Sequence, residues 1–221
     1  MISPWPAANG ARPDPSEAAA RRRWAVRSLD LAAVRLSTRP PRLPVDTRVL
    51  GTPPGEALLT AGVNAGPLVP GSRGLGTTSA SLLGSTSART AAVADFPLTL
   101  VRPPESHPGE PAPDGPVLLT LDAGHGHNSL AAAVRRPPRV RRAGRLLTEV
   151  LTPWRQKIPE VRVEEVCLED VPACAVPTAG GHAALVALGH RVASGDTPRL
   201  GAVAHAAVRR ATSPVLSVPY G

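Results

Sequence analysis

The chain repeats part of itself, and this internal repeat constrains the fold more than any other feature of its 221 residues. Residues 54–73 (PGEALLTAGVNAGPLVPGSR) align with residues 172–191 (PACAVPTAGGHAALVALGHR) at an offset of 118 positions. After one deletion the alignment resumes at an offset of 117, and the matches keep their order over nearly 60 positions. Such self-similarity is typical of a duplicated structural unit.

Each copy predicts the same order of elements. An extended run, a proline-initiated helix, a short apolar strand ending in glycine, a glycine-containing loop, a second helix and a final strand follow one another. The extended segments fall at residues 45–50, 67–71 and 97–101, and again at 161–168, 183–189 and 214–218. Strands that alternate with helices predict βαβ units and a parallel sheet covered on both faces. The expected fold class is α/β, with two Rossmann-like parallel-sheet units in tandem.

The repeat also predicts the domain organisation. Residues 1–43 form an N-terminal remnant with one helix, from Ser16 as N-cap to about Leu36. The predicted domains are a first unit at 44–102, a Pro-rich linker at 103–115 and a second unit at 116–221. Residues 116–124 (PVLLTLDAG) predict a fully buried first strand that ends in a loop aspartate. The equivalent strand of the first copy would precede Met1, so both units are expected to be incomplete.

The chain is basic, with a net charge of +8 and Lys157 as its only lysine. A basic balance can indicate nucleic acid or anionic membranes as partners. The arginines are scattered, however, except in residues 135–145 (RRPPRVRRAGR), which we expect to fill a loop. Only 2% of the residues are aromatic, which disfavours stacking on single strands. Nucleic acid is therefore an unlikely partner.

The cysteine content and the hydropathy pattern bear on the compartment. Cys167 and Cys174 are the only cysteines, and their spacing matches no standard zinc site or disulfide framework. The N-terminus has no basic region followed by an apolar one, and no apolar run approaches the roughly 18 residues that span a bilayer. We therefore expect a cytoplasmic protein without a membrane partner.

The candidate functional site is a glycine-rich loop in the first copy. Glycines directly after a strand let the backbone turn tightly and approach a ligand closely. A helix N-terminus presents free N–H groups and a partial positive charge to anions. The predicted phosphate-binding residues are Gly71, Ser72, Arg73, Gly74, Gly84, Ser85 and Thr86. The alternative is a tight strand–loop–helix connection with a well-capped helix.

This loop resembles a known nucleotide-binding signature. Its spacing, G-x2-G-x9-G-[ST], is similar to that of the ATP-binding branch of the universal stress proteins. LLTEVLTPWRQKIPEVRVEEV (residues 146–166) resembles the helix and third strand of that family, and LDAG at 121–124 resembles its first-strand loop. The resemblance implies two adenine-nucleotide alpha-hydrolase-like units, ATP as the ligand and Asp122 as a nucleoside contact. A tandem chain with a degenerate second copy is similar to actinobacterial members.

The sequence also departs from the family pattern. The second copy has Gly-His-Arg-Val at 189–192 where the loop glycines should continue, and Ala202 replaces the serine. Asp122 survives only in the second copy, so neither copy keeps a complete nucleotide site. Pro177 lies inside a predicted helix, and Pro70 adjoins a predicted central strand.

Three functions are compatible with these features. The first is a nucleotide-responsive, ATP-binding protein of the stress response, in which ligand shifts conformation or partner affinity. The second is a degenerate paralogue that binds no nucleotide and acts as a structural or interaction protein. The third is a nucleic-acid binder acting through residues 135–145. Nothing predicts an enzyme, and two histidines near Asp122, His125 and His127, are too few for a confident metal site.

The expected partners follow from the resemblance. The last strands of the two units, residues 98–101 and 215–218, should pair in an intramolecular pseudo-dimer, because an apolar terminal strand otherwise leaves an open edge. The chain could also form homo- or hetero-oligomers with related proteins.

Overall fold

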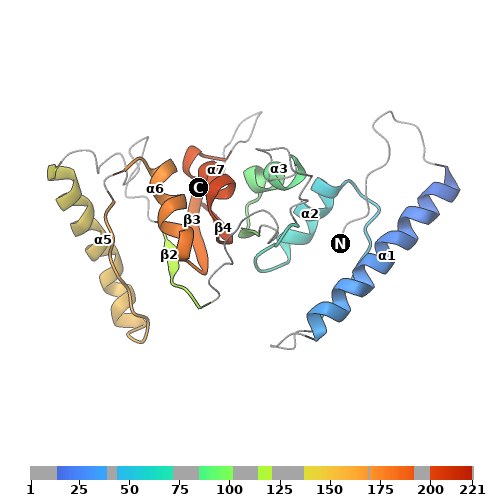
Figure 1. Cartoon of the computed structure of the whole chain (residues 1–221), viewed down its shortest axis with the longest axis horizontal. Helices are drawn as coiled ribbons and strands as arrows, with labels where there is room; N and C mark the ends of the chain where they lie inside the picture. Colours follow the sequence, from blue (N-terminus) through green and yellow to red (C-terminus); the bar gives the residue numbers. More distant parts are fainter. Residues whose placement is uncertain are drawn as a thin grey trace. The chain divides into compact units, whose positions relative to one another are not determined.

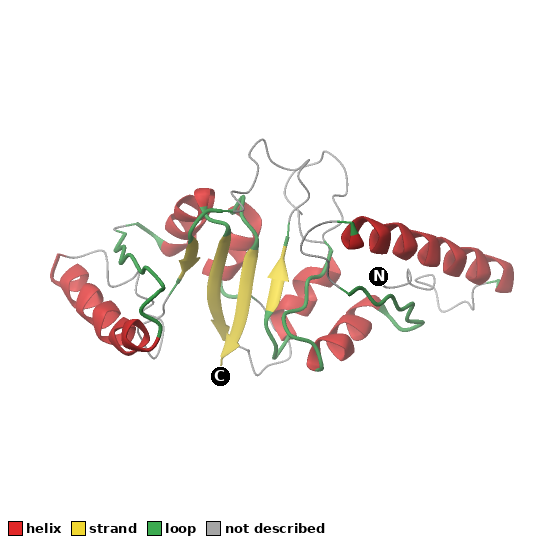
Figure 2. Ribbon diagram, turned by 90° about the horizontal axis from the view of Figure 1, so that it is seen from below, coloured by secondary structure: helices red, strands yellow, loops and turns green. Residues whose placement is uncertain are grey.

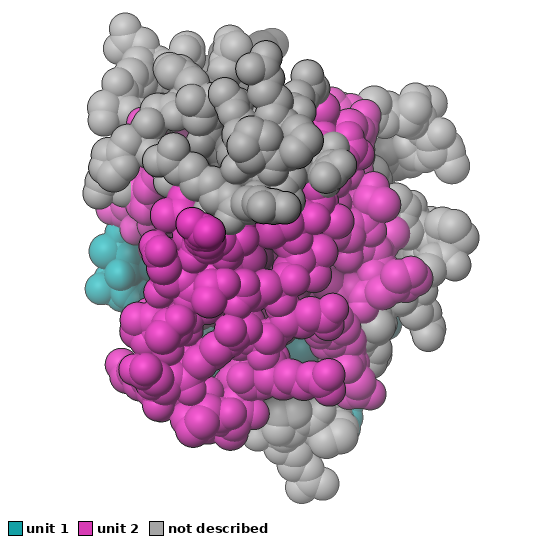
Figure 3. Space-filling view, turned by 90° about the vertical axis from the view of Figure 1, so that its left-hand side faces the viewer, with its two compact units in different colours: residues 1–66 teal, residues 67–221 magenta. Residues whose placement is uncertain are grey.

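A computed structural model describes residues 14–38, 44–71, 85–101, 114–120, 137–168, 170–191 and 200–220. The chain divides into two compact units, Met1–Gly66 and Pro67–Gly221 (Figure 3). The smaller unit contains two helices, α1 (Pro15–Ser37) and α2 (Pro54–Val63). The domain boundaries that we expect from the repeat remain a prediction.

The N-cap of helix α1 lies two residues before the predicted one. Asp14, not Ser16, is the N-cap, and its carboxylate accepts hydrogen bonds from the Ser16 backbone N–H at 3.2 Å and the Ser16 hydroxyl at 2.7 Å. Both bonds lower the pKa of the Asp14 carboxyl, and the bond from the Ser16 hydroxyl has the larger effect. Pro15 then takes the first helical position, where its missing N–H costs nothing.

The larger unit holds a four-stranded sheet and most of the helices (Figures 1 and 2). Its strands are β1 (Leu98–Leu100), β2 (Val117–Leu119), β3 (Leu185–Arg191) and β4 (Val215–Tyr220), in the order β1-β4-β3-β2. Strands β2, β3 and β4 are parallel, and β1 pairs antiparallel with β4. Its helices are α3 (Ser85–Val93), α5 (Pro137–Lys157), α6 (Pro172–Ala179), the 3-10 turn η2 (Gly180–His182) and α7 (Ala202–Arg210).

The pairing of the two closing strands is confirmed. Leu98 lies opposite Ser217 and Leu100 opposite Val215, in the antiparallel β1–β4 ladder. Each of these strands follows a proline, Pro97 or Pro214, as the sequence predicts. The ladder gives hydrogen-bond partners to the backbone groups along an edge of β4 that would otherwise be unpaired.

The local structure repeats with the same offsets as the sequence. Helices α2 and α6 both begin at a proline, and their starts differ by 118 positions; α3 and α7 begin and end 117 positions apart. Leu68 pairs with Leu98 as Val186 pairs with Val215. Gly71 likewise pairs with Val101 as Gly189 pairs with Val218. Equivalent residues of the two copies thus occupy equivalent positions in their ladders.

Pro70 explains why the two ladders differ in length. Leu68 and Gly71 make only isolated bridges to the β1 region, whereas β3 is a continuous strand. Pro70 stands between the two bridges and has no N–H to donate to its neighbour. Its counterpart Leu188 has one and pairs with Ser217. The predicted strand at 67–71 is therefore reduced to two isolated β-bridges.

The expectations about three strand segments are wrong, and so is the loop expected at 135–145. Residues 45–50 and 161–168 belong to no strand of the described sheet. Strand β2 is not buried, because Val117 is 60% and Leu119 is 57% exposed. Among the described strands β2 borders only β3, so no neighbour covers its other edge. The segment expected to fill a loop at 135–145 instead contributes residues 137–145 to the start of α5.

Candidate functional site

Gly71 marks the strand end from which the predicted phosphate loop starts. A Cβ at Gly71 would meet no atom of the described residues beyond its chain neighbours within 4 Å, so these residues leave open space beside the glycine. Leu68 and Gly71 form parallel bridges to Leu98 and Val101, and Gly71 is the later of the two, so it lies at the carboxyl end of its extended segment. Open α/β sheets bind ligands at this end of their strands.

Helix α3 begins directly after the predicted phosphate loop. Its first residue is Ser85, and Thr86 follows as a half-buried residue of the first turn. The hydroxyl of the buried Ser87 donates to the Gly71 carbonyl oxygen at 3.4 Å, a long hydrogen bond. The two ends of the 72–84 segment are therefore adjacent, and the α3 N-terminus lies beside the end of the strand.

Several predicted site residues lie outside the described part of the chain. These are Ser72, Arg73, Gly74, Gly84 and Asp122, together with the side chain of Ser85 and the two loop histidines, His125 and His127. Among the residues that the structure describes, no group of three His, Cys, Asp or Glu side chains could hold a metal ion. The described residues of the candidate site are thus Gly71, Ser85 and Thr86, with Ser87 added by the structure.

At the equivalent position in the second copy, an aromatic ring lies beside the glycine. A Cβ on Gly189 would lie 3.1 Å from the ring of Tyr220, and the Arg191 guanidinium lies 6.0 Å from the centre of that ring. Ala204 stands where the first copy has Ser87, so the hydroxyl that reaches the strand end is absent. The two copies therefore differ in what surrounds Gly71 and its equivalent, Gly189.

A buried histidine follows Gly189. His190 is 4% exposed, and its Nδ1 lies 2.8 Å from the hydroxyl of the fully buried Ser217. Its Nε2 is buried without a hydrogen-bond partner. Burial lowers the pKa of His190, since the charged imidazolium loses its hydration. The neutral ring joins β3 to β4 and is a structural element of the second copy.

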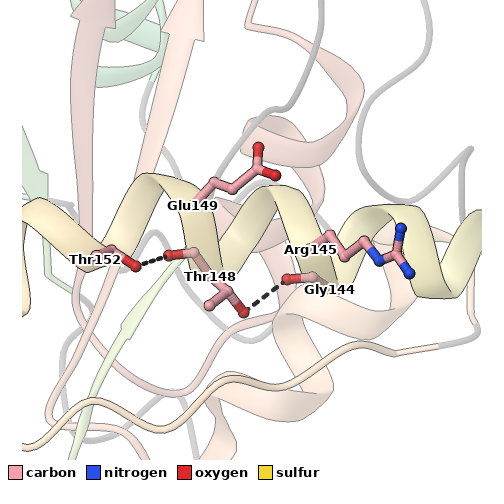
Figure 4. A pocket seen from close by; sticks show the side chains of 5 residues that line it. All are labelled: Gly144, Arg145, Thr148, Glu149 and Thr152. Atoms are coloured by element: carbon pink, nitrogen blue, oxygen red, sulfur yellow. Dashed lines mark hydrogen bonds between the residues drawn. The ribbon is translucent and has the colours of Figure 1, made fainter.

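An open depression on α5 is a weak candidate for a ligand site (Figure 4). Five residues of this one helix line it: Gly144, Arg145, Thr148, Glu149 and Thr152. The Thr152 hydroxyl donates to the Thr148 carbonyl oxygen at 2.7 Å, and the Thr148 hydroxyl lies 3.0 Å from the Gly144 carbonyl oxygen and 2.7 Å from Glu165 Oε2. Because these hydroxyls are already engaged within the protein, few polar groups converge on a ligand here.

Glu165 also helps to fix residues 161–168, which have no hydrogen-bonded strand partner in the described sheet. Its carboxylate lies 2.9 Å from Arg155 Nη1, and Arg155 Nη2 donates to the Val163 carbonyl oxygen at 3.1 Å. Side chains of α5 thus anchor the segment that the sequence predicts to be a strand.

Sequence reasoning missed two residues of functional interest, Ser87 and Tyr220. The alignment at an offset of 117 already sets Ser87 opposite Ala204, so this difference could have been noticed. Tyr220 lies at the end of β4, beyond the matched region, and only the fold brings its ring over Gly189.

Comparison with solved structures identifies the fold. A universal stress protein from Archaeoglobus fulgidus DSM 4304 matches with a TM-score of 0.65 and 17% identity, over 97% of this chain and 83% of that one. A candidate universal stress protein from Pseudomonas aeruginosa UCBPP-PA14 matches with a TM-score of 0.53 and 13% identity, over 95% and 80%. A protein of unknown function from Pseudomonas aeruginosa PAO1 matches with a TM-score of 0.51 and 13% identity, over 95% and 79%. This chain therefore has a fold like that of the universal stress proteins.

The sequence itself gives no further match. No protein-family model and no curated protein matches the chain. Within the described residues, no helix is both long and apolar enough to cross a membrane.

Proposed function

We propose that this chain is a universal stress protein-like ATP-binding protein that acts through ligand-dependent conformation or partner binding, in the cytoplasm and in the response to stress. It consists of two copies of one α/β unit, of which only the first binds nucleotide. We propose a binding role and no catalysis. The observation that carries the proposal is the adjacency of Gly71 and the start of α3, through the hydrogen bond from Ser87 to the Gly71 carbonyl oxygen.

This adjacency is what a phosphate site requires. The segment 72–84 leaves one strand end and returns at a helix N-terminus beside it, so its backbone N–H groups and the helix dipole can act on one anion. The open space above Gly71 leaves room for that anion. The glycine spacing of the loop and the likeness of the fold to universal stress proteins favour ATP among the possible ligands.

The asymmetry of the two copies supports binding to the first alone. The ring of Tyr220 lies close beside Gly189, and Ala204 lacks the hydroxyl that Ser87 provides. The repeated ladder registers support the duplication, and the β1–β4 ladder supports a pseudo-dimer of the two copies within one chain.

Thermal unfolding with and without ATP tests this function. A ligand that binds only the folded state at 100 times its dissociation constant adds about 2.7 kcal/mol of stability. For a chain of this size the melting temperature should rise by roughly 5–10 °C. Gly74→Val should abolish the rise, because a branched side chain occupies the space that the phosphates approach.

The matched control is Gly201→Val at the start of α7. Gly201 is the N-cap of α7, and a Cβ there meets no atom within 4 Å. This variant should keep the full ATP-induced shift. If the folded wild type shows no shift with saturating ATP, the chain is a degenerate paralogue that acts by protein interaction.

A further inference from the structure

The buried residues of α3 are more polar than those of α7, its counterpart in the second copy. Ser87 and Thr90 of α3 are 4% and 1% exposed. At an offset of 117 positions, Ala204 and Ala207 of α7 correspond to them and are 3% and 0% exposed. The first copy therefore buries two hydroxyl groups at positions where the second copy buries two methyl groups.

A hydroxyl at these positions adds little to the stability of the fold. Burying a hydroxyl costs free energy unless it finds a hydrogen-bond partner, and alanine also has the higher helix propensity. Among the described residues, the buried hydroxyl of Thr90 has no such partner. The hydroxyl of Ser87 donates to the Gly71 carbonyl oxygen at 3.4 Å, which is longer than a usual O–H···O hydrogen bond. Such a long bond contributes little to global stability.

The two ends of α3 are held by different contacts. Ala91, in the second half of the helix, is 0% exposed, and the N–H of Ala94 donates to the Thr90 carbonyl oxygen at 2.9 Å. In the first turn, the Ser87 hydroxyl reaches the end of the extended segment 67–71. Loss of this hydroxyl therefore acts on the first turn and leaves the second half of the helix packed.

The first turn of α3 is also the part that the proposed ATP site uses. The backbone N–H groups at the start of a helix, here those of Ser85, Thr86 and Ser87, have no partner within the helix. They bind an anion tightly only if they are already held in place, because ordering them on binding subtracts from the affinity. The bond to Gly71 holds them beside the strand end from which the phosphate loop starts.

We propose that Ser87 is a positioning residue of the nucleotide site, an inference that rests on the ATP-binding function proposed above. Its buried hydroxyl holds the first turn of α3 against Gly71, so that the N–H groups of that turn are ordered before ATP binds. It therefore contributes to the affinity for ATP rather than to the stability of the fold. The second copy lacks this contact, because Ala204 has no hydroxyl.

Calorimetric titration with ATP and thermal melts without ligand test this role on the full chain. Ser87→Ala should raise the dissociation constant for ATP about threefold to tenfold, which is the range that one hydrogen bond provides. The melting temperature without ligand should change by less than about 2 °C. The matched control is Thr90→Val, which removes an equally buried hydroxyl from the same helix and should leave the affinity unchanged.

Two results of these measurements would overturn the positioning role. One is an affinity that Ser87→Ala leaves unchanged, or that Thr90→Val lowers as much. The other is a fall of more than about 4 °C in the melting temperature of Ser87→Ala without ligand, since Ser87 would then support the whole fold. If the folded wild type binds no ATP, the proposed function itself is refuted.

Hydrogen exchange of the ligand-free protein tests the position of the first turn without ATP. The amides of Arg89 and Thr90 donate to the carbonyl groups of the first two residues of α3, so their exchange reports opening of that turn. Ser87→Ala should speed their exchange about threefold to tenfold, the same range, and leave the Ala94 amide unchanged. Equal rates at Arg89 and Thr90 in the variant and the wild type would refute the positioning role, whether or not the wild type binds ATP.

Discussion

The hydroxyl of Ser217 lies 2.8 Å from Nδ1 of His190, and both side chains are almost completely buried on the covered face of β3 and β4. The pair joins two parallel strands at the place where the first copy of the repeat begins its glycine loop. Because Nε2 of the same ring is buried without a partner, a proton added to the ring would be a buried, unpaired charge.

This histidine should make stability depend on pH. Burial lowers the pKa of folded His190 below its usual 6.5, so between the two values the unfolded chain binds more protons than the folded one. The free energy of unfolding should therefore fall as the pH drops below about 6.5, by at most about 1.4 kcal/mol per pH unit. Urea unfolding at pH 7.5 and 5.5 measures this loss. His190→Leu should reduce it, whereas replacing the exposed His205 by Gln should not; equal losses in both variants would contradict the assignment.

Gly180 should tolerate no side chain. A Cβ there would lie 2.5 Å from Cγ2 of the fully buried Val186, so Gly180→Ala should cost about 1–3 kcal/mol through overpacking. A Cβ on the neighbouring Gly181 would meet no atom within 4 Å, and Gly181→Ala should stay within about 0.5 kcal/mol. Denaturant unfolding compares the two. Adding Val186→Ala to Gly180→Ala should cost less than the sum of the single changes, and strict additivity would refute the clash.

Ser213 should stabilise the turn between α6 and β3. Its buried hydroxyl lies 2.6 Å from the carbonyl oxygens of both Gly180 and Ala183. Ser213→Ala removes this donor and should cost about 1–3 kcal/mol, because the Ala183 carbonyl oxygen loses the hydroxyl, whereas the Gly180 carbonyl oxygen keeps the Ala183 backbone N–H. The control is Thr212→Ala, whose hydroxyl donates to the exposed Gly181 at 3.2 Å and should contribute less. Thermal melts that rank the two variants in the opposite order would rule out this role.

The anchor between α5 and residues 161–168 should be weak. Arg155 and Glu165 are 40% and 22% exposed, and partly solvated ion pairs contribute about 0–1 kcal/mol. Glu165→Gln should therefore change the free energy of unfolding by no more than about 1 kcal/mol, and salt should reduce the difference. Glu164→Gln provides the comparison at the adjacent residue. A loss of several kcal/mol, insensitive to salt, would mean that the pair is buried in solution.

Local sequence signals determined much of the secondary structure. Pro54 and Pro172 begin their helices because proline is preorganised for the first helical position. Pro97 and Pro214 precede the closing strands, and the self-alignment already contained the offsets at which the elements recur. The glycine spacing also predicted the end of the extended segment at Gly71 and the start of the helix that became α3, because the backbone requirements of such a connection are local. The site residues themselves stay a prediction.

Other features depended on contacts between residues far apart in the chain. The apolar run that became β2 gave no indication that Val117 and Leu119 would be exposed, because burial depends on what covers a strand. Residues 161–168 have the composition of a strand, yet a strand needs a ladder partner, and side chains of α5 hold the segment instead. The bond from Ser87 to Gly71 and the ring of Tyr220 over Gly189 likewise join positions that no local pattern relates. The starts of α2, α3, α6 and α7 and the correspondence of the two copies follow from backbone preferences and spacing, which are local to the sequence, whereas the cap of α1 and the start of α5 differ from what the sequence predicted. The burial of each sheet face and the position of Tyr220 beside Gly189 are visible only in the tertiary structure, because both depend on packing between distant segments.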